Sequence, residues 1–505
     1  MASRYYFHCL AHLRPSSSFT FTKIRTYTSN LAQYPTIQNF ASSLALTQPH
    51  FSLSSDKIHI LSNPTQFYTQ LIDLIQGAEK RIFISSLYIG STETRLIETI
   101  RDTLRSKKSL HLYLQLDYNR STRPGPSSTV ALLLPLLKEF PDRCHVSLFR
   151  SPKLKGVFSK LIPSRFNEGF GTWHAKIYGA DDSLMISGAN LNKSYFTDRQ
   201  DRYLLFSSAP ELASYCFDFL KTVSSFSYRL IPPSTPDSTG AHSILHWSHS
   251  SIHPHHIEHH ANLALSGLQR RYNAKSGNIQ EKLQRDDTVI VFPVIQAGQL
   301  NVREEEECLG QLFYHLQPAS SQGATLNFHP QLSLTSGYFG LSSTYKDLIL
   351  RSHVPTRIIC ASPQANGFYG SKGISSRLPE GYTWLEQQFM AAVRAPQSQD
   401  KHSRPVELKE WNRHGWTYHA KGIWLSPNFQ SPPILTLFGS TNLNTRSAHL
   451  DTELSFLMLA NSVTIQKKLQ LELEGLSDFG EDWKGGQRNV RLITRILARL
   501  LSGYL

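Results

Sequence analysis

Short runs of β-branched and aromatic residues alternate along the chain with longer segments whose apolar residues recur at helical spacing. The short runs predict β-strands and the longer segments predict amphipathic helices. The predicted strands form two groups, which lie at 80–89, 110–118, 144–150, 173–179 and 183–188, and at 288–295, 324–334, 356–362, 416–425 and 434–440. Helical patterns begin after Thr92, Thr129 and Pro210, and near Glu304, Trp384 and Val463. This alternation predicts an α/β fold in which each half of the chain forms a β-sheet flanked by helices.

The two halves of the chain also repeat one another in sequence. The string "TWHAKIYG" around His174 matches "TYHAKGIW" around His419, and "ISSLYIG" matches "LTSGYFG" upstream of them. Downstream, "SGANLNKSYFTDRQDRYLLF" aligns without a gap with "GSTNLNTRSAHLDTELSFLM", so that Asn190 corresponds to Asn442. Three matching segments in the same order indicate an internal duplication. We therefore predict two similar lobes related by a pseudo-two-fold axis, with equivalent residues face to face.

The length of the chain agrees with two lobes. A single hydrophobic core usually stops growing near ~250–300 residues, and this chain has 505. We expect the boundary between the lobes where Pro, Ser and Thr become frequent, in "PPSTPDSTGAHS". The predicted division is a leader over 1–55, a first lobe over 56–231, a His-rich linker or insertion over 232–284 and a second lobe over 285–505.

Metal-binding side chains are concentrated in the linker, where the histidines are His246, His249, His253, His255, His256, His259 and His260. Imidazole is a common metal ligand, but Glu258 alone adds a carboxylate to this tract. The five cysteines of the chain are scattered without a CxxC pair, so neither a zinc site nor a disulfide framework is predicted. We predict no metal site and leave the role of the tract open.

The N-terminal segment has the composition of a targeting sequence. Residues 1–55 contain no Asp or Glu, while arginines and lysines are interleaved with serines, threonines and aromatic residues. This composition is typical of a mitochondrial transit peptide. The string "KIRTYTSN" resembles a matrix-protease site, and the mature protein is expected to begin near Tyr27. A disordered basic tail is the alternative.

Charge and hydropathy narrow the range of partners. The net charge of +14 favours anionic partners such as nucleic acid, phosphorylated small molecules or an acidic membrane surface. The longest apolar stretch, "TVALLLPLL", is far shorter than the ~20 residues that span a bilayer, so no transmembrane helix is predicted. The C-terminal "QRNVRLITRILARLLSGYL" has the pattern of a basic amphipathic helix on an anionic membrane, with a helix docked on the second lobe as the alternative. A second candidate membrane contact is "PKLKGVFSKLIPSRFNEGF", just before His174.

The repeated strings carry groups suited to phosphate chemistry. His174 and Lys176 lie two residues apart in a predicted strand, so both side chains face the same way, as do those of His419 and Lys421. If the two strands meet, two imidazoles and two ammonium groups converge with the asparagines of the repeat. Lysines and amides can hold the oxygens of a phosphodiester. One imidazole can then attack phosphorus while the other protonates the leaving oxygen.

At this point the sequence resembles a known group of enzymes. His174, Lys176 and Asp181 fit the His-x-Lys-x4-Asp pattern of the phospholipase D superfamily, and "SGANL" and "GSTNL" fit the segments that follow it. The resemblance implies two phospholipase D-like lobes and a two-step transfer through a phosphohistidine that requires no metal or other cofactor, with modulation by divalent cations left open. The second copy departs from the pattern at Ser426, where the aspartate is missing. We expect an active enzyme whose complete first copy supplies the nucleophile, with a structural role for the aspartate.

The resemblance also implies roles for individual residues. The predicted catalytic group is His174, Lys176, Asp181, His419 and Lys421, with the first histidine as nucleophile and the second as acid and base. The predicted substrate-binding group is Asn190, Asn442, Asp201, Glu453, Arg120 and Arg123. The two acids of this group are expected to reach across to the histidine of the other lobe and to raise its pKa, with Asp451 as a competitor for Glu453.

Within the superfamily, "GANLNKSYFTDRQDRY", "HAKGIWL" and "GSTNLNTRSAHLDTE" resemble the mitochondrial CDP-diacylglycerol–glycerol-3-phosphate phosphatidyltransferases. The resemblance implies phosphatidyl transfer from CDP-diacylglycerol to sn-glycerol 3-phosphate, in the biosynthesis of phosphatidylglycerol and cardiolipin. It implies a peripheral position on the mitochondrial inner membrane, in agreement with the predicted leader, and no nucleic acid partner. The oligomeric state stays open.

Two other interpretations remain at this stage. One is another superfamily enzyme, such as a phospholipase, a cardiolipin synthase-like transferase or a nuclease, and the choice of acceptor separates these. The other is a catalytically silent scaffold or metal-binding protein, for which Ser426 and the His-rich tract are the support. That interpretation predicts that the protein keeps its role without His174.

Overall fold

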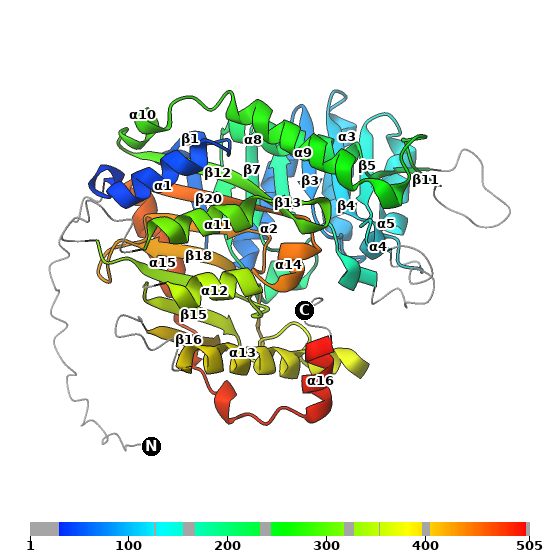
Figure 1. Ribbon diagram of the computed structural model, residues 1–505. Helices are drawn as coiled ribbons and strands as arrows, with labels where there is room; N and C mark the ends of the chain where they lie inside the picture. The colour runs from blue at the N-terminus through cyan, green and yellow to red at the C-terminus, as the bar shows by residue number, and fades with distance from the viewer. Residues whose placement is uncertain are drawn as a thin grey trace, which may run out of the picture.

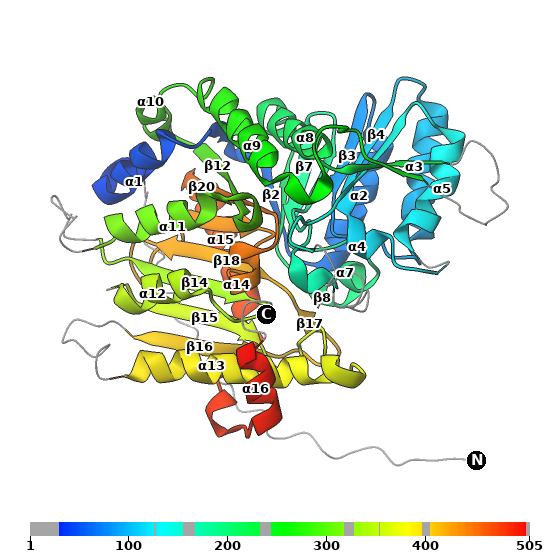
Figure 2. The same cartoon turned by 45° about the vertical axis from the view of Figure 1, so that its right-hand side comes forward.

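The computed structural model describes residues 30–125, 128–154, 167–232, 244–317, 328–352, 354–395 and 405–500. Two mixed β-sheets lie side by side with helices packed on them, which confirms the α/β fold expected from the sequence (Figure 1). In the turned view of Figure 2, the first sheet and its helices lie on the right and the second on the left.

The first sheet comes from the N-terminal half of the chain. Its strands follow the order β11 (Ile244–His246), β10 (Tyr228–Ile231), β5 (Cys144–Phe149), β4 (His111–Asp117), β3 (Arg81–Ser85), β6 (Ile177–Ala180), β7 (Ser183–Ser187), β9 (Tyr203–Phe206) and β2 (Ile58–Leu61). Strands β3, β4 and β5 run parallel, and the other neighbours are antiparallel. One face is covered by the helices α2 (Pro64–Gly77), α3 (Thr94–Ser106) and α5 (Thr129–Glu139).

The second sheet repeats this topology. Its strands follow the order β1 (Phe51–Ser54), β12 (Thr288–Ala297), β20 (Glu453–Asn461), β19 (Leu435–Gly439), β18 (Lys421–Ser426), β14 (Gln331–Ser336), β15 (Thr356–Ala361), β16 (Val406–Trp411) and β21 (Gly480–Asp482). Strands β14, β15 and β16 run parallel, and the other neighbours are antiparallel. The eight strands from β12 to β21 have the same order and the same relative directions as the eight strands of the first sheet read from β2 to β10. The duplication is therefore visible in the topology. One face is covered by α11 (Glu304–His315), α12 (Ser343–Arg351) and α13 (Leu378–Arg394).

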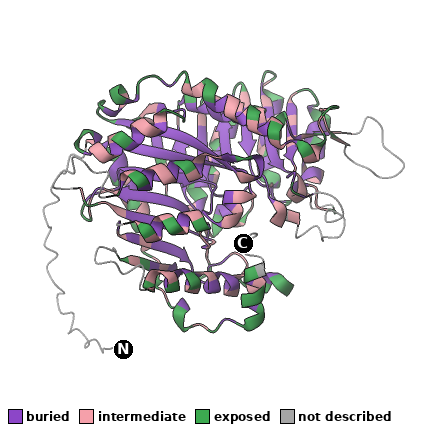
Figure 3. Ribbon diagram, viewed as in Figure 1, coloured by how far each residue is buried: buried purple, intermediate pink, exposed green. Residues whose placement is uncertain are grey.

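A shared core joins the two sheets. Phe206 of the first sheet stacks on Phe438 of the second, with 6.1 Å between ring centroids. Arg202 crosses the same boundary, where Nε and Nη2 each lie 2.8 Å from a carboxylate oxygen of Glu472 and the guanidinium covers Trp424. Helices α8 (Pro210–Ser224) and α15 (Val463–Ser477) contribute apolar side chains to this core. Figure 3 shows that the central strands of both sheets are buried.

The predicted leader is too long. Helix α1 (Pro35–Ala45) packs against α11 through Ile37, Phe40 and Leu44, which are fully buried, and β1 pairs with β12 of the second sheet. These apolar residues recur at helical spacing, which allows the segment to pack as an amphipathic helix. The absence of acidic residues from a segment does not prevent such packing. The cleavage site predicted near Tyr27 lies within 1–29, outside the described residues.

The predicted linker is also partly a folded element. Strand β11 extends the first sheet, and helix α9 (Glu258–Asn273) packs on α8. Ala261, Leu265 and Leu268 are fully buried on α9 at positions i, i+4 and i+7. The sequence analysis did not predict this helix because the tract is rich in polar residues, although its few apolar residues recur at helical spacing. Residues 233–243 of the predicted linker lie outside the described part of the chain.

Among the described residues we find no helix with the length and hydropathy needed to cross a bilayer.

Candidate active site

The two His-Ala-Lys segments exchange hydrogen bonds between the lobes. The amide nitrogens of His174 and Ala175 donate to the carbonyl oxygen of Thr452, over 2.9 and 3.1 Å. In the other lobe, the amide nitrogen of His419 donates to the carbonyl oxygen of Gln200 over 2.8 Å. Thr452 precedes Glu453 and Gln200 precedes Asp201, so each histidine is held beside an acid of the opposite lobe. The exchange is reciprocal, as the gapless alignment of the repeats predicts.

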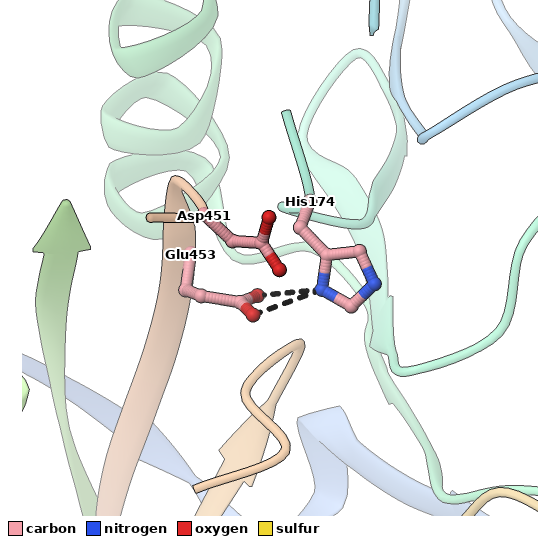
Figure 4. A group of neighbouring side chains, drawn as sticks. All are labelled: His174, Asp451 and Glu453. Atoms are coloured by element: carbon pink, nitrogen blue, oxygen red, sulfur yellow. Dashed lines mark hydrogen bonds and ion pairs between the residues drawn. The ribbon is translucent and has the colours of Figure 1, made fainter. Parts of the chain in front are cut away.

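The acid beside His174 is Glu453. Both carboxylate oxygens lie 2.9 Å from Nδ1 of His174, and both side chains are buried (Figure 4). Ser447, on helix α14 (Thr445–His449), donates a hydrogen bond to the same carboxylate over 2.8 Å. Asp451 instead accepts hydrogen bonds from the amide and hydroxyl of Thr172, at 2.8 and 2.9 Å. The structure thus decides between the two candidate acids in favour of Glu453.

The acid beside His419 is Asp201. Its carboxylate lies 2.6 Å from Nδ1 of His419 and 3.4 Å from the ammonium nitrogen of Lys421. On the other side of the ring, the hydroxyl of Tyr195 lies 3.4 Å from Nε2. The rings of Tyr195 and Tyr338 both meet the imidazole edge-on, with centroids 5.1 and 5.4 Å away. Each predicted acid is therefore in contact with the histidine of the other lobe.

Lysine and asparagine side chains complete the centre. Lys176 and Lys421 are both 1% exposed, and the ammonium group of Lys176 donates to the carbonyl oxygen of His174 over 2.5 Å. The carbonyl oxygens of the Asn190 and Asn442 side chains are buried, and neither has a hydrogen-bond partner among the described residues. Buried polar groups without partners are uncommon in folded proteins. These two amides are therefore poised to bind a polar ligand.

Burial controls the charge states of the centre. Burial lowers the pKa of His174, and the carboxylate of Glu453 raises it by less. Burial lowers the pKa of His419 well below its ordinary value, and Lys421 lowers it further. The sequence led us to expect raised values, and the difference arises because burial and the lysines outweigh the acids. Although burial raises the pKa of Glu453, contact with His174 and Lys176 outweighs it and lowers the pKa.

These charge states define what the imidazoles can do. Glu453 is ionised at neutral pH and can only accept a hydrogen bond, so Nδ1 of His174 carries the proton. The lone pair of Nε2 is then free to attack an electrophile. Burial also lowers the pKa of Lys176 to about 7, although Glu453 raises it. The centre therefore combines a neutral imidazole with positive charge that is available near neutral pH.

Asp181 is placed apart from this chemistry. Its carboxylate accepts hydrogen bonds from the amides of Glu79, Lys80 and Arg81 over 2.7 to 2.9 Å, and its own φ of 48° forms the turn between β6 and β7. The residue ties this turn to the start of β3, at the end of β6 away from His174. The structure therefore supports a structural role and not the catalytic assignment. The missing aspartate at Ser426 takes no group away from the centre.

The predicted arginines lie on a short neighbouring helix and just after it. Asp117 accepts hydrogen bonds from the amides of Arg120 at 2.8 Å and of Trp173 at 3.0 Å, which ties helix α4 (Tyr118–Ser121) to the segment before His174. The guanidinium of Arg120 lies 4.3 Å from the centroid of the Tyr88 ring. Arg123 follows the same helix. Substrate binding by these two arginines stays a prediction.

Arg199 and the two tyrosines beside His419 were missed by the sequence analysis. The guanidinium of Arg199 lies 4.6 Å from the centroid of the Tyr195 ring, and its Nε donates to the hydroxyl of Thr417 over 3.0 Å. A signal was present in the alignment, which pairs Arg199 with Asp451 and Tyr195 with Ser447. These are the positions at which the two halves of the centre differ in charge and size.

Metal-ligating atoms gather at one place in the described part of the chain. Donor atoms of His174, Asp451 and Glu453 lie within 4.8 Å of one another (Figure 4). These donors already have partners within the chain, since Glu453 binds His174 and Asp451 binds Thr172 and Arg446, the latter over 3.0 Å. The contacts account for the cluster without an ion.

Comparison with known proteins shows where the chain belongs. No family model matches the sequence. A protein of Schizosaccharomyces pombe named CDP-diacylglycerol–glycerol-3-phosphate 3-phosphatidyltransferase is 34% identical over 458 residues, which cover 84% of this chain and 89% of that protein. The mitochondrial proteins of the same name from Gallus gallus and Homo sapiens are both 32% identical, and the matches cover 90% and 85% of this chain and 85% and 78% of those proteins. The chain belongs to this family.

As a member of the CDP-diacylglycerol–glycerol-3-phosphate 3-phosphatidyltransferase family, the protein is a transferase. A solved structure gives a matching fold. The crystal structure of phosphatidylserine synthase from Haemophilus influenzae matches 93% of this chain and all of that chain, with a TM-score of 0.66 and 19% identity.

Proposed function

We propose that the protein transfers the phosphatidyl group of CDP-diacylglycerol to sn-glycerol 3-phosphate, giving phosphatidylglycerophosphate and CMP. The names of its relatives support this pair of substrates. The observation that carries the chemistry is the pair of buried imidazoles, each bound by a carboxylate of the other lobe and flanked by a buried lysine. The product is the precursor of phosphatidylglycerol and cardiolipin.

In the first step, Nε2 of His174 attacks the phosphorus that carries the diacylglycerol. A phosphorus–nitrogen bond forms and the bond to the CMP oxygen breaks, with His419 donating a proton to that oxygen. The negative charges of the donor favour the protonated form of His419, which offsets the effect of burial on its pKa. Lys176 and Lys421 stabilise the charge that develops on the phosphoryl oxygens.

In the second step, the acceptor takes the place of CMP. His419, now neutral, removes the proton from a hydroxyl of glycerol 3-phosphate, and the oxygen attacks the phosphorus. The bond to Nε2 of His174 breaks and the imidazole returns to its starting state. The two lysines supply positive charge from the chain itself, so we propose that the transfer requires no metal or other cofactor.

Two observations support His174 rather than His419 as the nucleophile. The side chain of His174 is 9% exposed and that of His419 is 4% exposed. Tyr195 and Tyr338 enclose the His419 ring, and the hydroxyl of Tyr195 lies near its Nε2. Nε2 of His174 is the more open position for attack on a large lipid substrate.

The test of the proposed function is a transfer assay. With CDP-diacylglycerol and glycerol 3-phosphate, the purified protein is expected to form phosphatidylglycerophosphate and CMP in equal amounts, measured by mass spectrometry. Release of phosphatidic acid alone would identify a hydrolase instead. Formation of cardiolipin from phosphatidylglycerol as acceptor would identify a different transferase of the same superfamily.

We further propose that the protein binds the surface of an anionic membrane through helix α16 (Leu492–Leu500), as a peripheral protein of the mitochondrial inner membrane. Three apolar side chains of this helix face solvent, since Leu492 is 72%, Ile493 54% and Ile496 45% exposed. The exposed side chains of Arg491 and Arg495 flank them. Apolar residues beside arginines are the pattern of an interfacial helix.

The position of α16 suits a lipid substrate. Its other face packs on α13, where Val490 and Ala498 lie in a cluster with Trp384. Helix α13 also carries Tyr382, whose ring centroid lies 5.5 Å from that of Tyr338 beside His419. One helix thus connects the exposed face to the candidate active site. Most of the second candidate segment, 155–166, lies outside the described residues.

Replacing Ile493 with glutamate is expected to lower the fraction of protein that sediments with vesicles of anionic phospholipid. Burying one isoleucine side chain contributes about 1.5–3 kcal/mol, so the partition coefficient should fall at least about tenfold. The matched control is Leu471→Glu on α15, where a leucine that is 66% exposed lies outside the proposed surface. Equal losses in both variants would contradict the role of α16.

A further inference from the structure

Equivalent positions in the two halves of the active site carry opposite charges. The gapless alignment pairs Arg199 with Asp451. The contacts agree, because Nε of Arg199 donates to the hydroxyl of Thr417 over 3.0 Å, and the hydroxyl of Thr172 donates to Asp451 over 2.9 Å. Each threonine stands two residues before the histidine of its lobe. The same structural position therefore presents a cation beside His419 and an anion beside His174.

The neighbouring pair of positions enhances this difference. Ser447 is a small residue that donates to Glu453, whereas its counterpart Tyr195 places a phenol beside His419. The ring of Tyr195 lies under the guanidinium of Arg199. The His419 side of the centre is thus lined by a guanidinium and phenols, which are hydrogen-bond donors suited to an anion.

Arg199 also differs from Asp451 in its charge balance. Asp451 is paired with Arg446 over 3.0 Å, but in the described part of the chain Arg199 forms no ion pair with a carboxylate. Burial lowers the pKa of Arg199, but Tyr195 and Tyr338 outweigh it and the pKa is raised, so the guanidinium stays charged. A partly buried cation without a counter-ion is costly unless an anion binds there.

The backbone leaves little freedom around this guanidinium. A Cβ atom at Gly367 would lie 2.9 Å from Nη2 of Arg199 and 2.8 Å from the hydroxyl oxygen of Tyr338. The donors of Arg199 and Tyr338 therefore meet at one place, held there by Gly367 and by the contact with Thr417. A fixed fork of donors is suited to bidentate recognition of a phosphate.

We propose that Arg199, with Tyr195 and Tyr338, binds a second phosphate group beside the reacting phosphorus, on the His419 side of the centre. The inference rests on the proposed function, in which both substrates carry such a group. His174 attacks from one side, so the leaving group and then the acceptor occupy the other side, next to His419. The group is either the phosphate monoester of glycerol 3-phosphate or the nucleotide phosphate of the donor.

The experiment compares Arg199→Gln and Arg199→Lys with the unaltered enzyme in steady-state kinetics. A bidentate charged contact contributes on the order of 30- to 100-fold in binding. Arg199→Gln should therefore raise one KM by about that factor, and Arg199→Lys should recover only part of it because a lysine lacks the fork. A higher KM for glycerol 3-phosphate alone assigns the group to the acceptor, and a higher KM for CDP-diacylglycerol alone assigns it to the donor.

Two controls keep the result interpretable. Arg351→Gln removes an arginine of α12 whose side chain is 83% exposed, and both KM values should stay unchanged. Calorimetric titration with glycerol 3-phosphate and with CMP measures binding without turnover. The affinity should fall for glycerol 3-phosphate if the KM of the acceptor rises, and for CMP if the KM of the donor rises. A fall in kcat with both KM values and both affinities unchanged would overturn the inference. The proposed function has its own test, which is independent of the Arg199 variants: it is wrong if the unaltered enzyme forms no phosphatidylglycerophosphate.

Discussion

Replacing His174 with alanine is expected to lower the rate of phosphatidyl transfer by at least about 10⁴-fold, because the variant lacks the atom that accepts the phosphatidyl group in the proposed mechanism. Glu453 binds Nδ1 of His174, which leaves Nε2 of that ring as the nitrogen for attack. Without it, the donor has no route to the covalent intermediate. The measurement is release of CMP from labelled CDP-diacylglycerol, with and without acceptor.

The matched variant is His419→Ala, which keeps the nucleophile. CMP leaves through its own phosphate oxygen, and a phosphate is a good leaving group even without protonation. A glycerol hydroxyl is a weak nucleophile and depends more strongly on a base. The first step should therefore proceed in this variant while the second is slowed, and labelled phosphatidyl-protein should accumulate. Denaturing gels and peptide mapping should place the label on His174. Label on His419 in the His174→Ala protein would reverse the two roles.

The duplicated sequence predicted the centre because it fixed which residues are equivalent. Once Asn190 and Asn442 were aligned, Asp201 and Glu453 fell at the same distance after them. Each acid contacts the histidine of the other lobe. The apolar runs predicted the two sheets for a similar reason. Each run in the first half has a counterpart in the second half, and the two sheets share one strand order. Repetition supplied long-range information that a single copy does not contain.

Other features could not be predicted because they depend on contacts that no local pattern records. Asp181 satisfies three backbone amides, and nothing in its spacing from His174 separates this role from catalysis. The pKa of His419 is lowered by burial, which only the packing of Tyr195 and Tyr338 around it reveals. Helix α1 was overlooked because composition was given more weight than the spacing of its apolar residues.

Replacing Glu453 with glutamine is expected to lower kcat on the order of 10²- to 10⁴-fold and to shift the pH optimum toward acid. The glutamine amide can still accept a hydrogen bond from Nδ1 of His174, but the charge is lost. Glu453 raises the pKa of Lys176, which is about 7 in the unaltered protein. Without Glu453 this pKa falls, so Lys176 loses its proton near neutral pH and recovers it only in more acidic solution.

The pH–rate profile separates this effect from a loss of structure. Ser447→Ala removes one hydrogen bond to the Glu453 carboxylate and leaves its charge in place. That variant is expected to lose on the order of 10- to 100-fold in kcat, with an unshifted profile, because a hydrogen bond to a charged carboxylate contributes about 1.5–3 kcal/mol. The acidic shift should therefore appear in Glu453→Gln alone. An unshifted profile in Glu453→Gln would show that Lys176 is not held in its charged form by this carboxylate, and that Glu453 acts only by orienting His174.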